Sequence, residues 1–248
     1  MAFIPLPVNL IRGVEVQHTE QYLRLNFAEP RQVLGNTVLN GGSSQVTGLV
    51  NLRVSGAGLS GYQDPAISLT QFCVQQGWSE NSVGMMTAAS MASARIHCSM
   101  VEDEQIAVMV TSGLANARRA GDLAEYRQLD ALVTKTGTIN TVVLSSAQLS
   151  GAVMAEVLML ASEAKAALLQ ELDIRSPVSN KIATGTGTDA IAVVSGVASR
   201  ADSGIEKRAI QYAGKHTLLG EVLAKLVMSA TAESLQYELD FSGRQQCG

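Results

Sequence analysis

The residues best suited to chemistry gather in one stretch, residues 181–194, with the sequence KIATGTGTDAIAVV. Thr184, Thr186 and Thr188 alternate there with glycines and are followed at once by Asp189. A threonine hydroxyl both donates and accepts hydrogen bonds, a carboxylate can take up a proton, and glycine lets the backbone approach a ligand closely. The pattern therefore suits hydroxyl and proton-transfer chemistry. A tight turn whose threonines bond their own backbone is the simpler interpretation of the motif taken alone.

Two further side chains stand where they can take part in chemistry. Residues 152–172 form a predicted amphipathic helix, and Lys165 falls within its apolar face. A lysine there must reach solvent, pair with a carboxylate or serve catalysis, and snorkelling or pairing is the commoner outcome. His216 directly precedes Thr217, the expected N-cap of the last helix, and is the best acid–base candidate of the three histidines. A histidine that only bonds a neighbouring loop is the alternative.

Three predicted strands meet a Gly/Thr/Asn segment at one end. The strand at 105–112 leads into TSGLAN (111–116), GTIN (137–140) leads into the strand at 141–145, and TGTGTD (184–189) leads into the strand at 191–194. Polar groups at one end of several strands are what a ligand site over a sheet needs. We therefore expect these three segments to lie together.

The remaining patterns predict a layered arrangement. Strands are expected at 14–27, 33–42 and 46–54, the last two paired across an Asn-Gly-Gly turn in which Asn40 tolerates a left-handed conformation. Helices are expected at 64–77, at 83–95 with Thr87 as an ordinary helix hydroxyl, and from 217 onward. We predict an α+β fold, a layered sandwich of mixed or antiparallel sheets covered by helices, in a single domain of residues 1–248. We expect residues 1–30 to form strands of unknown role and residues 241–248 to be a loose tail.

Composition narrows the classes of function. The 248 residues are 46% hydrophobic and 16% charged, and the net charge of −4 gives no reason to expect a nucleic-acid partner. Cys73, Cys98 and Cys247 lack metal-type spacing and are odd in number, which argues against a disulfide framework. Without HExxH spacing or a GxSxG motif, we expect no metal and no cofactor. Pro5 and Pro7 interrupt the first residues, so we expect no signal peptide. The longest uncharged run, 136–155, is rich in Thr, Ser, Asn and Gln, so we expect no membrane insertion and a cytoplasmic protein.

Seven segments together resemble the adenosylcobinamide amidohydrolase family of corrinoid salvage. In the family's order they are VLNGG (38–42), VGMMTAA (83–89), VTSGLANA (110–117), GTIN (137–140), SEAKAALL (162–169), ATGTGTDAI (183–191) and YAGKHTLLGE (212–221). The resemblance implies hydrolysis of the amide that joins cobyric acid to its aminopropanol arm. A corrinoid would be bound as substrate, and a homo-oligomer is compatible with the sequence.

The resemblance suggests a working mechanism for this reaction. Amide hydrolysis needs a nucleophile, a site for the developing oxyanion and an acid for the leaving amine. We expect His216 to act as base or acid, oriented by Asp189 or Glu221. Thr186 or Thr188 would be the nucleophile or a hydroxyl that positions water.

The other polar positions of the matching segments are expected to stabilise and bind the substrate. Lys165 and Asn140 would steady the oxyanion. The expected substrate-binding residues are Asn40, Gly41, Gly42, Thr87, Asn116, Thr138, Asn140, Thr184, Glu163 and Glu221.

Two other functions stay open at this point. The protein can be a corrinoid-binding accessory of uptake that has the pocket without the hydrolysis, or an amidase acting on another amide. The set His216, Lys165, Asp189 and Asn140 favours an enzyme, because an accessory protein needs no such groups.

Overall fold

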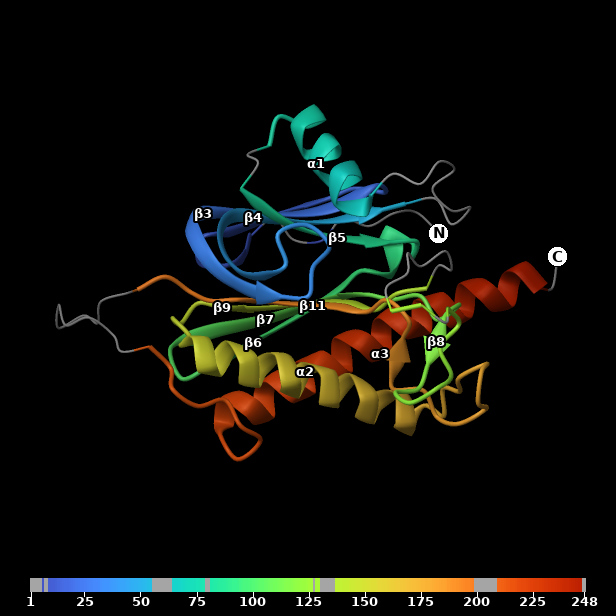
Figure 1. Ribbon diagram of the computed structural model, residues 1–248. Coiled ribbons are helices and arrows are strands. Elements are labelled where there is room, and N and C mark those ends of the chain that lie inside the picture. The colour runs from blue at the N-terminus through green and yellow to red at the C-terminus, as the bar shows by residue number, and fades with distance from the viewer. Residues whose placement is uncertain are drawn as a thin grey trace.

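The strands and helices lie in four layers (Figure 1). This computed structural model describes residues 6, 9–54, 64–78, 81–126, 128–129, 137–198 and 209–246, with the backbone alone at residue 9 and at 241–246. The outer helix α1 (Pro65–Gln75) covers a first layer of strands: β1 (Asn9–Ile11), β2 (Val14–His18), β3 (Tyr22–Gly35), β4 (Gly42–Arg53) and β5 (Ser82–Thr87). The second layer contains β6 (Arg95–Val101), β7 (Glu104–Thr111), β9 (Asn140–Ser145) and β11 (Ala190–Val194), covered by α2 (Gly151–Glu171) and α3 (Leu218–Gln246).

Strand β3 joins the two layers into one nine-stranded sheet. Its first half pairs with β2, its last residues pair with β11, and β4 runs antiparallel along its length. The register with β4 shifts between Asn26 and Arg31, a segment that contains Pro30. Proline has no N–H to donate to the ladder and is tolerated at such bulges, where a strand bends. The bend lets β3 pass from the first layer to the second.

Buried apolar side chains separate the layers into three cores. The core between the two layers of strands includes Leu25, Leu49, Met109 and Leu144. A second core, between β7, β9, β11 and the helices α2 and α3, is built from alternate residues of the same strands, such as Val108 and Val143. A third, smaller core lies beneath α1, where Val50, Leu52, Leu69 and Cys73 are buried. The predicted α+β sandwich in a single domain is confirmed.

Most of the predicted elements near the site are also confirmed. Strands β7, β9 and β11 lie within one residue of their expected bounds. Helix α2 begins after Ser150, whose hydroxyl accepts from Val153 N at 3.3 Å, and α3 begins after Thr217, whose hydroxyl accepts from Gly220 N at 3.0 Å. Asp64 caps α1 as expected, and Gly77 follows its end with φ +68°.

The helix expected at 83–95 is wrong. Residues 82–87 form β5 parallel to β4, a short 3₁₀ turn η1 (Met91–Ser93) follows, and β6 begins at Arg95. Five of the six β5 residues are buried, so the run shows no alternation, and periodicity cannot distinguish such a strand from a buried helix. The end of the chain also differs from expectation, because α3 is helical as far as Gln246.

Candidate active site

The three Gly/Thr/Asn segments meet at one edge of the second layer. Strand β7 runs antiparallel to β9 and ends where β9 begins, with Thr111 opposite Asn140. Strand β11 runs parallel to β9 and starts at the same level, with Ala190 opposite Asn140. Hydrogen bonds join the segments beyond the strands: Gly113 N donates to Thr138 O and Gly187 N donates to Asn116 O, each at 3.0 Å. The predicted clustering is confirmed.

Asp189 is the centre of this cluster. Its carboxylate accepts four hydrogen bonds: from Lys165 Nζ, from the backbone N–H of Thr186 and of Ile139, each at 2.9 Å, and from the Thr186 hydroxyl. The side chains of Lys165 and Asp189 are 5% and 11% exposed, so the ion pair is nearly shielded from water. Of the three roles left open for Lys165, the structure shows pairing with a carboxylate.

Two residues make room for this ion pair and hold it. A Cβ on Gly185 would lie 2.3 Å from Asp189 Oδ2 and 3.0 Å from Lys165 Nζ, so the close approach requires glycine. Asn36 holds the backbone on either side of the carboxylate, because its Nδ2 donates to Asp189 O at 2.8 Å and its Oδ1 accepts from Ile191 N at 2.7 Å. Sequence reasoning missed Asn36. The only signal for it was its place beside the Asn-Gly-Gly turn.

The threonines of the motif differ in what their hydroxyls do. Thr186 is half-buried, and its hydroxyl donates to Asp189 Oδ1. The Thr188 hydroxyl donates its one proton to Gly137 O at 3.0 Å. The hydrogen bond of 2.6 Å between Thr138 Oγ1 and Thr188 Oγ1 is therefore donated by Thr138. A hydroxyl bonded to a carboxylate can lose its proton to that carboxylate, whereas one bonded to a backbone carbonyl cannot. Thr186 is therefore the better candidate for attack or for orienting water.

Asn116 places its side-chain amide beside Gly187, the residue that follows Thr186. Its backbone carbonyl accepts from Gly187 N, and its Oδ1 accepts from Arg118 Nε at 3.3 Å. A Cβ added to Gly187 would lie 2.4 Å from Asn116 Nδ2, so the amide N–H₂ faces this glycine. Gly187 itself is exposed, and Thr184 lies outside the cluster, where its hydroxyl accepts from Ala120 N at 2.9 Å.

Asn140 lies on the other face of the second layer. Its Nδ2 donates to Asn51 Oδ1 at 2.9 Å and to Met86 O at 3.0 Å, both in the first layer. Lys165 approaches from α2, on the opposite side of the sheet. Because alternate residues of a strand face opposite sides, Asn140 and Asp189 cannot serve one group together. The expected joint stabilisation of an oxyanion by Lys165 and Asn140 is wrong.

His216 does not join the cluster. It is exposed in the turn before α3, next to Gly214, where a Cβ would lie 3.0 Å from both the His216 ring and Glu156 Oε1. Glu156 precedes Lys165 by nine residues on α2, which corresponds to roughly 13 Å along the helix axis. Among the described residues His216 makes no hydrogen bond to Asp189, so the structure does not bring this expected pair together.

Two expected acidic residues, Glu163 and Glu221, pair with lysines. Glu163 is exposed and pairs with Lys215, and Glu221 pairs with Lys225 at 2.5 Å. The hydrogen bond and charge of Lys225 lower the pKa of Glu221. Both carboxylates are thus engaged on the surface by lysines and do not contact the Asp189 cluster.

The remaining expected residues lie in the turn before β4 and at the end of β5. Asn40 has φ +52°, as its turn role required, and its Nδ2 donates to Ser82 O at 2.8 Å. A Cβ on Gly41 would lie 2.4 Å from Thr37 O, and Gly42 has φ +88°. Thr87 is buried and accepts from Ala89 N at 3.0 Å. These contacts position the turn and the strand.

Within the described ranges, no three His, Cys, Asp or Glu side chains lie close enough together to hold a metal ion. Among the same residues, no helix is both long and apolar enough to span a membrane.

The matching sequence family covers almost the whole chain. The model of the adenosylcobinamide amidohydrolase family matches residues 7–242. The chain belongs to this family. A protein of Methanosarcina mazei named adenosylcobinamide amidohydrolase is 27% identical over 204 residues, which are 81% of this chain and 88% of that relative. An uncharacterized protein of Methanocaldococcus jannaschii is 32% identical over 165 residues, and the match spans 61% of each chain, less than two thirds of that relative's length.

Solved structures with a related arrangement are distant in sequence. A Burkholderia beta-aminopeptidase is 11% identical, with a TM-score of 0.46. The PH0078 protein of Pyrococcus horikoshii is also 11% identical, with a TM-score of 0.44. Each match covers 96% of this chain and 88% of the other.

Proposed function

We propose that this protein hydrolyses the amide between the corrinoid ring and the aminopropanol arm of adenosylcobinamide, releasing adenosylcobyric acid and aminopropanol. The observation that carries the proposal is the family match over residues 7–242, which includes every segment of the Asp189 cluster. We further propose that the reaction serves cobalamin salvage in the cytoplasm, and that the corrinoid is the substrate and no cofactor is needed.

The mechanism we propose begins at the Thr186 hydroxyl. Its oxygen attacks the amide carbon, or holds the water molecule that does, while Asp189 accepts the proton it already binds. Lys165 and the two backbone N–H groups on Asp189 hold the carboxylate in position until that transfer. The Nδ2 amide of Asn116, beside Gly187, is placed to donate to the developing oxyanion in the role first expected of Lys165 and Asn140.

The second half of the reaction returns the proton. When the C–N bond breaks, the leaving nitrogen takes the proton held by Asp189 and departs as the amine. If Thr186 is the nucleophile, water then hydrolyses the ester, one proton going to Asp189 and back to the hydroxyl. The net change adds one water molecule across the amide.

The direct test is incubation of the purified protein with adenosylcobinamide and detection of both products by mass spectrometry. Thr186→Val keeps the shape of the side chain without the hydroxyl and should lower turnover by about 10²–10⁴-fold. Thr141→Val is the matched control, since the buried Thr141 hydroxyl has no hydrogen-bond partner among the described residues and should be dispensable.

The outcomes separate the three functions. Product formation that depends on Thr186 supports the proposal. Corrinoid binding, seen as a shift of the absorption bands, without any product would instead show an accessory protein. If the protein neither binds the corrinoid nor forms product, the remaining function is that of an amidase acting on another substrate.

A further inference from the structure

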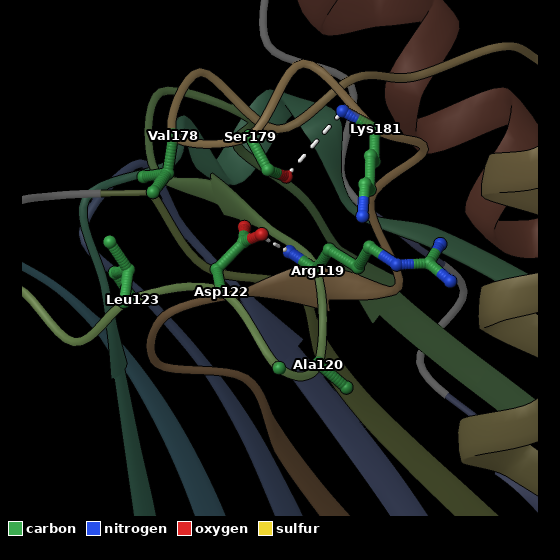
Figure 2. Close-up of a pocket in the computed structure, with 8 residues that line it drawn as sticks. Arg119, Ala120, Asp122, Leu123, Val178, Ser179 and Lys181 are labelled. Atoms are coloured by element: carbon green, nitrogen blue, oxygen red, sulfur yellow. Dashed lines mark hydrogen bonds between the residues drawn. The ribbon is translucent and has the colours of Figure 1, made fainter.

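A hollow of about 320 Å³ lies between the segment that follows β8 (Ala117–Arg118) and the one that precedes β10 (Gly185–Thr186). Figure 2 shows the Asp122 carboxylate between its walls, where it accepts from Arg119 N at 2.9 Å, and the Arg119 guanidinium turned away. That guanidinium donates to the carbonyl of Ile182 at 3.1 Å. These groups bond within the chain, whereas backbone groups at one edge of the large sheet do not.

Strand β6 is the last strand of the second layer, and among the described residues it pairs with β7 alone (Figure 1). The outer edge of β5 is closed by the turn before β4, because Leu39 and Gly84 exchange two backbone hydrogen bonds of 3.1 Å. The edge at β1 is three residues long and irregular in register. Of the edges described, β6 is thus the long one that remains open to another strand.

The ladder shows which backbone groups of β6 point outward. Ser146 N donates to Gln105 O at 2.9 Å, so the backbone of Gln105 points toward β9. Successive residues of a strand direct their backbone groups to opposite sides, so Ile106 bonds β6 through Ser99, which lies opposite. The same alternation along β6 leaves three residues whose N–H and C=O groups point to the open edge: Ile96, Cys98 and Met100.

This edge lacks the features that usually keep edge strands apart, which are lysine, proline or a bulge. The sequence of β6 is RIHCSMV, and its register with β7 is regular over all seven residues. Cys98 is exposed and Met100 is 55% exposed. An uncharged strip of side chains therefore accompanies the unpaired backbone groups.

The charges at the two ends of β6 have opposite sign. Arg95 begins the strand and has no carboxylate partner among the described residues, since it donates to two backbone carbonyls. The exposed residues Glu102 and Asp103 form the turn that follows the strand. Antiparallel pairing of two copies brings the basic end of one beside the acidic turn of the other, whereas parallel pairing brings like charges together. The charges therefore favour an antiparallel partner with this same strand.

We propose that β6 pairs with β6 of a second copy of this chain, antiparallel and about a two-fold axis at Cys98. The three outward residues are symmetric about Cys98, as a two-fold interface requires. Cys98 then lies opposite Cys98 of the second copy, and Ile96 of each copy lies opposite Met100 of the other. Each of these pairs exchanges two backbone hydrogen bonds, which makes one continuous sheet of the two molecules. The inference is independent of the proposed function.

Sedimentation velocity over a range of protein concentrations measures the association. The wild type should dimerise reversibly, and Met100→Lys should raise the dissociation constant at least about tenfold, because lysine on an edge strand opposes pairing. The matched control is Met159→Lys, the same substitution at a side chain of α2 that is 66% exposed, and it should change the dissociation constant less than about twofold. A wild type that stays monomeric up to about 1 mM, or equal dissociation constants for the two variants, would overturn the inference.

Disulfide cross-linking tests the register, in protein that carries Cys247→Ser so that Cys98 and the buried Cys73 are the remaining thiols. The two Cys98 Cα atoms should lie about 5.5 Å apart, within the span of a disulfide, so oxidation by diamide should link the two chains. Cys98→Ser combined with Met100→Cys keeps an exposed thiol on the same face but places the two thiols about 14 Å apart, and should not link. Equal linking in both proteins, or none in the protein that retains Cys98, would contradict the proposed pairing.

Discussion

Replacing each partner of the buried Lys165–Asp189 pair in turn tests how the candidate site is held together. The two side chains are not equivalent in their surroundings. Lys165→Met leaves Asp189 with three donors, the hydroxyl and N–H of Thr186 and the N–H of Ile139. Asp189→Ala leaves those donors without their acceptor and Lys165 as a buried charge, since Asp189 is its one hydrogen-bond partner among the described residues.

The expected free energies of unfolding follow from this asymmetry. Removing one member of a buried pair typically costs about 3–5 kcal/mol when the other charge is left uncompensated. We expect that range for Asp189→Ala. For Lys165→Met we expect about 1–2 kcal/mol, because Asp189 keeps hydrogen bonds that stabilise its charge and methionine suits the apolar face of α2. The double variant should be less destabilised than the sum of the two singles.

Urea denaturation followed by circular dichroism measures all three variants. Lys215→Met is the control, because it breaks an ion pair with Glu163 whose side chains are 71% and 52% exposed, and should cost less than about 1 kcal/mol. Equal losses of unfolding free energy for Lys165→Met and Asp189→Ala would refute the reasoning, because the three remaining donors would then not stabilise the Asp189 carboxylate. Turnover of Lys165→Met should fall at least tenfold, because the lysine fixes the proposed proton acceptor.

Three other perturbations have defined outcomes. His216→Ala should retain turnover within about threefold, since its ring is exposed and makes no hydrogen bond to the Asp189 cluster among the described residues; a loss of 10² or more would restore it as the acid or base. Treatment with a chelator followed by dialysis should leave activity unchanged, and activity that returns only with zinc or manganese would contradict this. Burial lowers the pKa of His18, whose Nδ1 accepts from Leu6 N at 3.1 Å, so the unfolded chain takes up its proton first as pH falls below about 6.5. The free energy of unfolding should therefore decline from pH 7.5 to 5.5, and less in His18→Gln; equal declines would be inconsistent with this account.

The sequence predicted the meeting of the polar segments because strand ends and glycine-rich turns are local signals. The apolar face of α2 likewise predicted that Lys165 points inward, because helical periodicity is regular over its 21 residues. The partner of Lys165 was not predictable from that pattern. It depends on the neighbouring strand, and several acidic residues were equally plausible before the register of β11 was known.

The wrong predictions share one physical cause. The spacing of residues in the sequence does not determine which side of a sheet a side chain faces, or which part of a helix a turn packs against. His216 lies in a Gly/Thr-rich segment like the others, yet its turn contacts α2 through Glu156 and Glu163 and, among the described residues, makes no hydrogen bond to Asp189. Asn36 looked like an ordinary turn residue and instead bonds both sides of Asp189 through its amide. Contacts across more than 150 residues decide the role of Asn36, and contacts across more than 50 residues place the turn of His216.

The side of the sheet also decides which polar cluster can meet a substrate. A shift of one residue moves a strand side chain to the other face, and this separates Asn140 from Asp189 although their strands start at the same level. The interlayer network of Asn51, Thr111 and Asn140 is only 1–2% exposed in each residue, so no corrinoid can contact it without opening the sandwich. Thr186 is half-buried and adjoins exposed Gly187. A substrate can therefore reach the Asp189 cluster, whereas it cannot reach the interlayer network. This accessibility, together with the chemistry of its groups, favours the Asp189 cluster as the place where an amide is cleaved.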